Sequence, residues 1–257
     1  MKTALFALMT FVFGCQAASA RDAGQLWVLL IGPQDYQHMA KLQFSGNDCE
    51  QMAQVLKTNY GVASDHIFKL VDSADSKVTR DGAMAAVRSF LDKPDVGDEI
   101  LVFYSGQGDK NAAGELMLPL EDAVPNQPNT ALSAKWLLDA LEMTPANTKT
   151  LILDTCYAAA LFRQAKNTDV TIFASSAENE ISYDWTDQRQ GMYTRWLLEG
   201  LSGSADADRD GKVSATELDR FVTPNVARTS GRIYRTPQNP SAKIPTDVPE
   251  AQFTLVK

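Results

Sequence analysis

Short apolar runs alternate along the chain with segments whose apolar residues recur every three or four positions. Runs of this kind predict buried strands, and the three-to-four-residue period predicts helices with one buried face. The predicted strands comprise residues 25–32, 66–71, 99–106, 149–156 and 170–176. The predicted helices comprise residues 47–60, 79–91, 133–143 and 192–201. This alternation predicts right-handed crossovers and an α/β fold, in which a mostly parallel sheet has helices on both faces.

Three of the predicted helices begin with residues that can accept hydrogen bonds from free backbone N–H groups. Asp48 and Gln51 fit a capping box, and Thr79 and Ser133 are candidate N-cap residues. Cys49 falls on the apolar face of the first of these helices, a position typical of inert packing.

Two predicted strands end in segments that carry polar and reactive side chains. One runs into SGQG, residues 105–108, and the other into DTCYAA, residues 154–159. Ligands of open parallel sheets bind beyond the carboxyl ends of the strands. If these two strands are neighbours, Gln107 and Cys156 share one crevice.

The charge balance argues against a nucleic-acid partner. The chain has 24 Lys and Arg against 32 Asp and Glu, a formal net charge of −8, and we find no basic patch in the sequence. Its 257 residues, 44% of them hydrophobic, can bury a full core. No repeat or linker divides it, so we predict a single domain over residues 21–257.

Residues 1–20 have the layout of a secretory signal, with one Lys, an apolar run and the small-residue ending Ala18-Ser19-Ala20. We expect a mature chain that begins at Arg21 and is exported to the periplasm or the extracellular space. The apolar run is shorter than the roughly 20 residues of a membrane span, so no span is predicted. A lipid on Cys15 is an alternative that the sequence leaves open.

Removal of this signal leaves two cysteines, Cys49 and Cys156. Export permits disulfides, but two thiols in a chain of this length do not make a disulfide scaffold. We therefore expect the hydrophobic core to hold the fold.

The segment DADRDGKVSATE, residues 206–217, fits the twelve-residue calcium loop of EF-hands. The predicted ligands are Asp206, Asp208, Asp210, Ser214 and Glu217, with the backbone carbonyl of Lys212. The alternative is an Asp-Gly turn before a helix over residues 215–222. The loop looks unpaired, so we expect a modest affinity that suits millimolar extracellular calcium.

Six segments carry a resemblance to a known family: GNDCEQMAQVL, GDEILVFYSGQG, LPLED, LILDTCYAA, FASSAENE and GMYTRWLLEGL. In order and spacing they are similar to the caspase-like cysteine peptidases, specifically the metacaspase-like bacterial branch. The resemblance covers nearly all of the chain after residue 20. It implies a caspase-like three-layer αβα sandwich around a mostly parallel sheet.

The resemblance also implies roles for the two strand ends. The family has a catalytic histidine in a Ser-Gly-His-Gly turn, and Gln107 occupies that position here. Cys156 matches the nucleophile, and the backbone N–H groups of Gly108 and Cys156 match the oxyanion hole. Ala159 stands where the family commonly has glycine.

Residues that match the family's first specificity pocket are Asp48, Ser105 and Asp154. The resemblance implies that they favour Arg or Lys before the scissile bond. For Asp48, helix capping remains an equal alternative, and the two roles can coexist.

Gln107 changes the expected chemistry because a neutral amide can neither stabilise a thiolate nor protonate a leaving amine. Cys156 would then keep an ordinary thiol pKa of about 8.5. We therefore expect a caspase-fold homologue with lost or much reduced peptidase activity and a peptide-binding or regulatory role. Its partners would be protein or peptide segments, some bearing Lys or Arg.

Two other functions remain open. One is an active cysteine endopeptidase cleaving after Arg or Lys, assisted by His38, water or the substrate. His38 follows the first strand on the correct side of the sheet, whereas His66 begins the second strand at the amino end. The other is a redox protein that uses Cys156 with Cys49.

Overall fold

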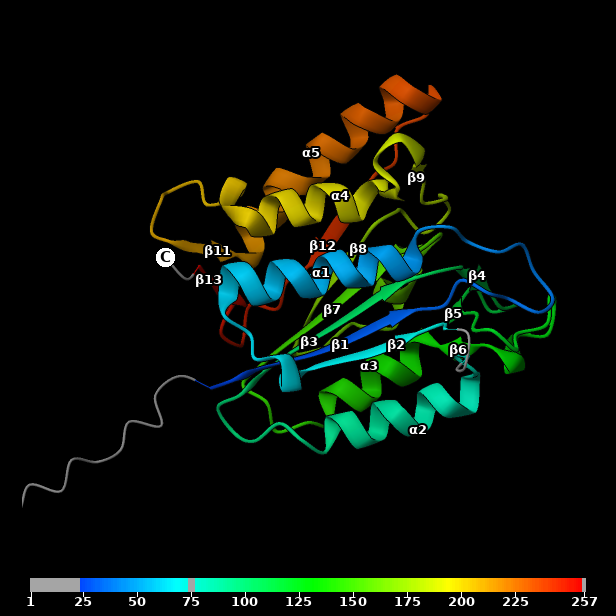
Figure 1. The fold of residues 1–257 in the computed structure, drawn as a ribbon, viewed down its shortest axis with the longest axis horizontal. Helices are drawn as coiled ribbons and strands as arrows, with labels where there is room; N and C mark the ends of the chain where they lie inside the picture. Colours follow the sequence, from blue (N-terminus) through cyan, green and yellow to red (C-terminus); the bar gives the residue numbers. More distant parts are fainter. Residues whose placement is uncertain (1–23, 74–76, 256–257) are drawn as a thin grey trace, which may run out of the picture.

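A six-stranded sheet runs through the middle of the protein (Figure 1). The computed structural model describes residues 24–73 and 77–255, so the predicted signal at 1–20 lies outside the described residues. In spatial order the strands are β12 (Ser241–Lys243), β8 (Val170–Ala174), β7 (Thr148–Asp154), β3 (Glu99–Ser105), β1 (Leu26–Gly32) and β2 (Ile67–Val71). Every neighbouring pair is parallel except β12 and β8. The predicted α/β class and mostly parallel sheet are confirmed.

Helices cover both faces of this sheet, giving three layers (Figure 1). On one face lie α2 (Arg80–Leu91) and α3 (Ala134–Glu142). On the other lie α1 (Ser45–Tyr60), α4 (Met192–Glu199) and α5 (Ala215–Tyr234).

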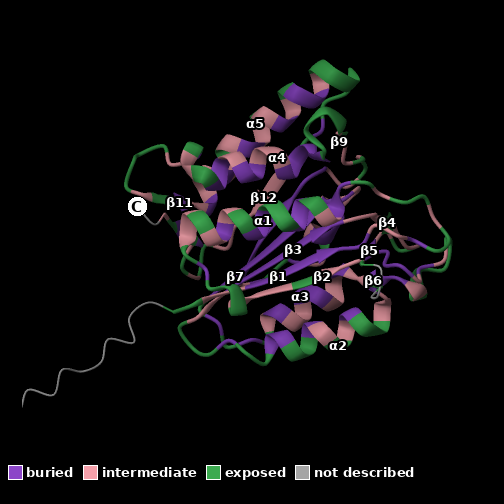
Figure 2. Ribbon diagram, viewed as in Figure 1, coloured by how far each residue is buried: buried purple, intermediate pink, exposed green. Residues whose placement is uncertain are grey.

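The central strands are apolar on both faces because helices shield both. In β1, Leu29 and Ile31 pack in the core beneath α2 and α3, whereas Val28 and Leu30 pack in the core beneath α1, α4 and α5. Strands β7 and β8 are buried at every residue, as Figure 2 shows for the centre of the sheet. This explains the continuous apolar runs in the sequence.

The caps of two helices match the prediction, and that of the first does not. Thr79 accepts from the N–H of Gly82 at 3.3 Å, and Ser133 accepts from Trp136 at 3.3 Å. Helix α1 begins at Ser45 after Phe44, without a side-chain cap. The predicted capping box at Asp48 is therefore wrong: Asp48 lies in the first turn of α1, and its carboxylate accepts from Ser105 and Gly191 instead of capping the helix.

The helix after the predicted calcium loop is much longer than expected. It runs over Ala215–Tyr234 instead of ending at residue 222, and Pro224 lies exposed within it. Ser214 and Glu217 form a capping box at its start. The segment before the loop, Gly200–Ser204, continues α4 as a π-helical turn.

Short strands and turns complete the fold. They form three small sheets, made of β4 (Asp109–Lys110) with β5 (Leu116–Leu118) and β6 (Leu132–Ser133), β9 (Asp184–Trp185) with β10 (Gln190–Gly191), and β11 (Lys212–Ser214) with β13 (Gln252–Thr254). Short 3₁₀ helices occupy Ser64–His66, Pro128–Thr130, Ala158–Arg163 and Thr186–Gln188. The strand of the predicted calcium loop is thus paired, since β11 lies antiparallel to β13. Within the described residues, no helix combines the length and apolar character that crossing a bilayer requires.

Candidate active site

The carboxyl ends of β3 and β7 lie side by side. Ser105 is in register with Asp154, and the N–H of Gly106 donates to the Asp154 carbonyl at 3.2 Å. A Cβ on Gly108 would come within 2.4 Å of the Cys156 carbonyl oxygen and 2.3 Å of Thr155 Oγ1. Only glycine fits there, so this close approach fixes the two turns against each other.

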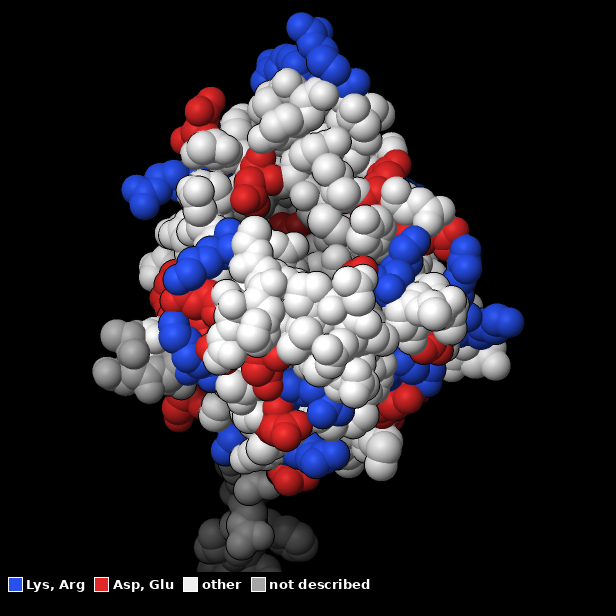
Figure 3. All heavy atoms as spheres, turned by 90° about the vertical axis from the view of Figure 1, so that its right-hand side faces the viewer, with Lys and Arg blue, Asp and Glu red and all other residues white. Residues whose placement is uncertain are grey.

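A cavity of about 180 Å³ opens where the two turns meet. Its wall consists of Leu42, Ser45, Ser105, Gly106, Gln107, Asp154, Thr155, Cys156, Ser182, Tyr183, Asp184, Gly191 and Tyr234. It thus contains Gln107 and Cys156 together but no Lys, Arg or His. Figure 3 looks onto this end of the molecule.

The turn that carries Cys156 is held by backbone hydrogen bonds. Tyr157 has φ of 63°, a left-handed conformation that is strained for a tyrosine. Its N–H donates to the Glu180 carbonyl at 2.8 Å, and the N–H of Ala159 donates to the Ser176 carbonyl at 3.0 Å. Ala159 does not have a positive φ. Alanine therefore fits this position, although the family commonly has glycine there.

The thiol of Cys156 is partly buried and lacks a cationic neighbour in the cavity wall. Burial, and to a lesser extent the charges of Asp154 and Asp184, raise its pKa above the ordinary thiol value. The N–H of Ser182, 3.4 Å from Sγ, opposes this shift only in part. The pKa is thus higher than the ordinary one expected from the sequence, and the thiol is protonated at neutral pH.

Gln107 is held in place through its backbone, and its side-chain amide cannot exchange a proton near neutral pH. Its N–H donates to the Tyr36 hydroxyl at 2.9 Å, and its carbonyl accepts from the Tyr104 hydroxyl at 2.8 Å. Its side-chain Nε2 lies 3.4 Å from the Ala40 carbonyl. No motif or spacing in the sequence pointed to these two tyrosines, because each contacts the turn only in the folded protein.

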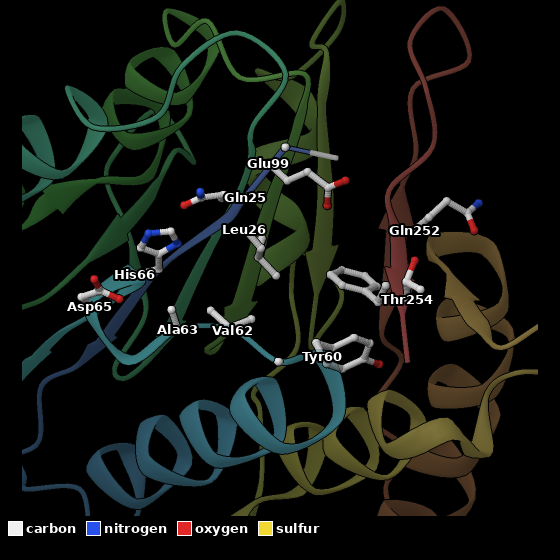
Figure 4. A pocket seen from close by; sticks show the side chains of 13 residues that line it. Gln25, Leu26, Tyr60, Val62, Ala63, Asp65, His66, Glu99, Gln252 and Thr254 are labelled. Atoms are coloured by element: carbon white, nitrogen blue, oxygen red, sulfur yellow. The ribbon is translucent and has the colours of Figure 1, made fainter. Parts of the chain in front are cut away.

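Neither histidine lines the cavity around Cys156. His38 is exposed in the loop after β1, two residues before Ala40. His66 lies at the amino end of the sheet, stacked on Trp27 with ring centroids 4.1 Å apart. It borders a different cavity, of about 550 Å³, which Figure 4 shows between the sheet, Tyr60 of α1 and strand β13.

The two predicted pocket acids are buried and hydrogen-bonded. Asp48 accepts from Ser105 Oγ at 2.8 Å and from the N–H of Gly191 at 3.1 Å. Asp154 accepts from Ser182 Oγ at 2.8 Å and from Thr194 Oγ1 at 2.6 Å. Burial raises the pKa of both carboxyls, and the charge of Asp154 raises that of Asp48 further. Of the two, only Asp154 lines the cavity, while Asp48 lies behind it.

A third acid, Asp184, lines the same cavity and was missed in the sequence. Burial and the charge of Asp154 raise its pKa to about 6. It follows β8 by ten residues, so no strand end or motif spacing pointed to it. Its backbone carbonyl accepts from the Tyr234 hydroxyl at 2.6 Å, and Tyr234 stacks on Tyr183 with centroids 4.5 Å apart.

Gln238, beyond α5, supports this wall from behind. It is completely buried, accepts from the N–H of Tyr183 at 2.9 Å, and donates through Nε2 to Ser182 Oγ at 3.0 Å and to the Ser175 carbonyl at 2.7 Å. The last segment of the chain therefore positions the loop that carries Asp184.

In the predicted calcium loop, the carboxylates of Asp206, Asp208 and Asp210 lie within 4.8 Å of one another. Asp206 Oδ1 is buried and has no hydrogen-bond partner among the described residues. Glu217 folds back across the loop and accepts from the N–H of Ala207 at 3.1 Å. Ser214 also bonds to Glu217, through Oγ at 2.8 Å. The side-chain oxygens proposed as ligands thus gather around one loop.

Comparison with known proteins assigns the chain to a family. The family described as Caspase domain matches residues 25–248, which is most of the chain. The chain belongs to the caspase-domain family. The predicted resemblance to the caspase-like cysteine peptidases is thereby confirmed, and Cys156 and Gln107 lie inside the matched region.

The caspase domain is also similar to two individual proteins. Metacaspase-4 of Arabidopsis thaliana is 24% identical over an alignment of 181 residues that covers 65% of this chain and 41% of the plant protein. The caspase domain thus spans less than half of that relative. The crystal structure of caspase-1 from Spodoptera frugiperda has the same fold, with a TM-score of 0.60, 16% identity and coverage of 86% of this chain and 85% of that one.

The raised pKa of Cys156 leads to a testable expectation for its reactivity. The rate of alkylation by iodoacetamide should be low at neutral pH and should keep rising beyond about pH 8.5, the ordinary thiol pKa. Mass spectrometry of the folded protein measures the rate at each cysteine separately. Cys49 is completely buried and should stay unlabelled, and Cys156→Ala supplies the blank. A rate that levels off below pH 7 would show an activated thiolate instead.

Proposed function

We propose that this caspase domain binds protein segments through a Lys or Arg side chain in the acidic cavity and has lost most or all peptidase activity. The observation that carries the proposal is the cavity wall itself. Asp154, Asp184 and Cys156 all line the cavity, and its wall contains no histidine, lysine or arginine.

The acidic residues of the cavity favour a positively charged ligand group. The carboxyls of Asp48, Asp154 and Asp184 resist ionisation because they are desolvated and because the charge of Asp154 acts on the other two. A guanidinium or ammonium group placed among them would offset both effects. Ser105, bonded to Asp48, would line this subsite as the sequence predicts.

The same wall lacks the groups that turnover requires. Peptide hydrolysis by a cysteine needs a thiolate and a proton for the departing amine. The Gln107 amide supplies neither, and burial keeps the Cys156 thiol protonated. The backbone N–H groups of Gly108 and Cys156 could still receive a peptide carbonyl, so a residual rate of roughly 10³ to 10⁴ over water is the expected ceiling.

The alternative is an active endopeptidase that cleaves after Arg or Lys. One observation favours it: the nucleophile turn is intact, with the strained Tyr157 and the close contact of Gly108 retained. His38 would be its candidate base, and it would have to move, since it does not line the cavity. A redox role has less support, because Cys49 is completely buried in the core.

We further propose that the loop over residues 206–217 binds calcium. The oxygens of Asp206, Asp208 and Asp210 converge, and the unpartnered Asp206 Oδ1 is a buried acceptor that a cation would satisfy. Glu217, Ser214 and the Lys212 carbonyl would complete the ligand set. Calcium would fix the connection between α4 and α5. The proposed export to the periplasm or extracellular space would expose the loop to millimolar calcium.

Binding of a peptide with a single Arg tests the proposed subsite. Affinity should rise about three- to fivefold between pH 5 and pH 7.5, because Asp184, with a pKa of about 6, gains its charge over this interval. Fluorescence anisotropy with wild-type and Cys156→Ala protein measures the affinity. Asp184→Asn should flatten the rise, whereas Asp187→Asn, a change on the neighbouring exposed turn, should leave it. If the same peptide with Ala in place of Arg binds equally well, the proposed subsite is wrong.

Gln107→His tests the proposed loss of catalysis. The substitution should increase cleavage after Arg or Lys by orders of magnitude, because histidine restores thiolate stabilisation and leaving-group protonation together. Fluorogenic reporters ending in Arg or Lys measure the rate, with Gln107→His/Cys156→Ala as the matched control. Robust hydrolysis by the unmodified protein that disappears in Cys156→Ala would instead establish the active endopeptidase.

Calcium should raise the melting temperature of the protein, because a ligand that binds only the folded state stabilises it. Differential scanning calorimetry in millimolar calcium and in chelator measures the shift. Asp206→Ala with Glu217→Ala should abolish it, whereas Asp65→Ala with Glu50→Ala, two acids elsewhere on the molecule, should not. An unchanged melting temperature in calcium would leave the Asp-Gly turn as a structural feature only.

A further inference from the structure

Three arginines lie at the carboxyl end of α5. Arg228 and Arg232 are four residues apart, which places them on one side of the helix, and Arg235 is the left-handed residue, with φ of 62°, that caps it. All three are exposed. We call these residues the arginine stripe.

The arginine stripe is not neutralised by the protein. No ion pair within the described part of the chain involves any of the three guanidinium groups. The one hydrogen bond found for them joins Arg228 to the Asn225 side-chain oxygen at 3.4 Å. Cations near a helix C-terminus do favour the helix dipole, but that interaction leaves their N–H donors open to an external acceptor.

The end of α5 carries both the stripe and a residue of the acidic cavity. Tyr234 lines the cavity and donates to the Asp184 carbonyl. Arg232 precedes it by two residues, so these two side chains leave the helix on different sides. Figure 3 shows basic side chains gathered over the end of α5, above a hollow with acidic side chains in its wall. The stripe and the cavity therefore open on one face of the molecule.

Apolar side chains accompany these charges. Ile233 and Tyr234 are 40% and 38% exposed, and Ile181, next to Ser182 of the cavity wall, is 47% exposed. Exposed apolar groups beside a binding cavity are typical of surfaces that contact protein.

We infer that the arginine stripe is a second subsite, which binds acidic residues of the same protein segment that places its Lys or Arg in the cavity. This inference rests on the proposed function. Electrostatics favours an acidic ligand at this stripe. Because the chain has a net charge of −8, an acidic segment is repelled over most of the surface and attracted at the stripe. The favoured ligand thus combines one basic residue with a cluster of acidic ones.

Binding of four synthetic peptides tests the inference. The first peptide contains a single Arg in a neutral sequence. The second and third add four Glu on the amino or the carboxyl side of that Arg. The fourth repeats whichever of these two binds more tightly, with Ala in place of Arg. We expect one acidic cluster to strengthen binding about tenfold at low salt, through three exposed ion pairs of modest strength. The gain should shrink in high salt.

The matched variants separate the stripe from general charge. Arg228→Gln/Arg232→Gln/Arg235→Gln should remove the gain and leave the affinity for the neutral Arg peptide unchanged. Lys57→Gln/Lys93→Gln/Lys166→Gln removes the same charge elsewhere and should keep the gain. Circular dichroism confirms that both triple variants remain folded.

Each outcome bears on one proposal. If the neutral Arg peptide binds and neither acidic cluster adds affinity, the stripe inference is wrong and the cavity proposal stands. If acidic peptides bind equally with and without Arg, and the binding needs the stripe, the stripe binds acidic segments on its own, and both the cavity proposal and the inference of one shared ligand are overturned. If stripe-dependent binding occurs only to vesicles containing phosphatidylglycerol, the partner is an anionic membrane surface and the inference of a protein ligand is overturned.

Discussion

The pairing of β3 with β7 is the constraint on which the site depends. Because Ser105 is in register with Asp154, the two strands end side by side, and the turns that follow them lie next to each other. The contact of Gly108 with the Cys156 carbonyl then leaves no room for a side chain between them. A shift of this register by one residue would send the two turns' side chains to opposite faces of the sheet.

Most of the fold could be predicted from the sequence because strands and helices leave local patterns of apolar residues. Continuous apolar runs identified β1, β3, β7 and β8, since strands buried on both faces must be apolar throughout. The ends of α1 and α5 were misplaced for a different reason. Helix α1 starts without a capping side chain, and α5 continues through Pro224 because its buried face packs on the core beyond that point.

Without the family resemblance, the site was predictable only where it follows strand ends. Gln107, Cys156 and Asp154 occupy such positions, so one topological rule brought them together. Asp184, Tyr36 and Tyr104 reach the same site from a hairpin, a loop and the interior of a strand. Their contributions depend on tertiary contacts, which have no period or spacing in a single sequence. The pKa of Cys156 was misjudged for the same reason, because burial decides it.

Because Gln238 supports the cavity wall, the site can be complete only after this late part of the chain has folded. A chain that emerges amino end first presents Cys156 and Gln107 long before residue 238 is available. Until Gln238 docks, Ser182 and Tyr183 lack the hydrogen bonds that hold their loop, and α5 has no Tyr234 in place over Asp184. A nascent chain would therefore have an incomplete cavity until residue 238 has been synthesised and has docked.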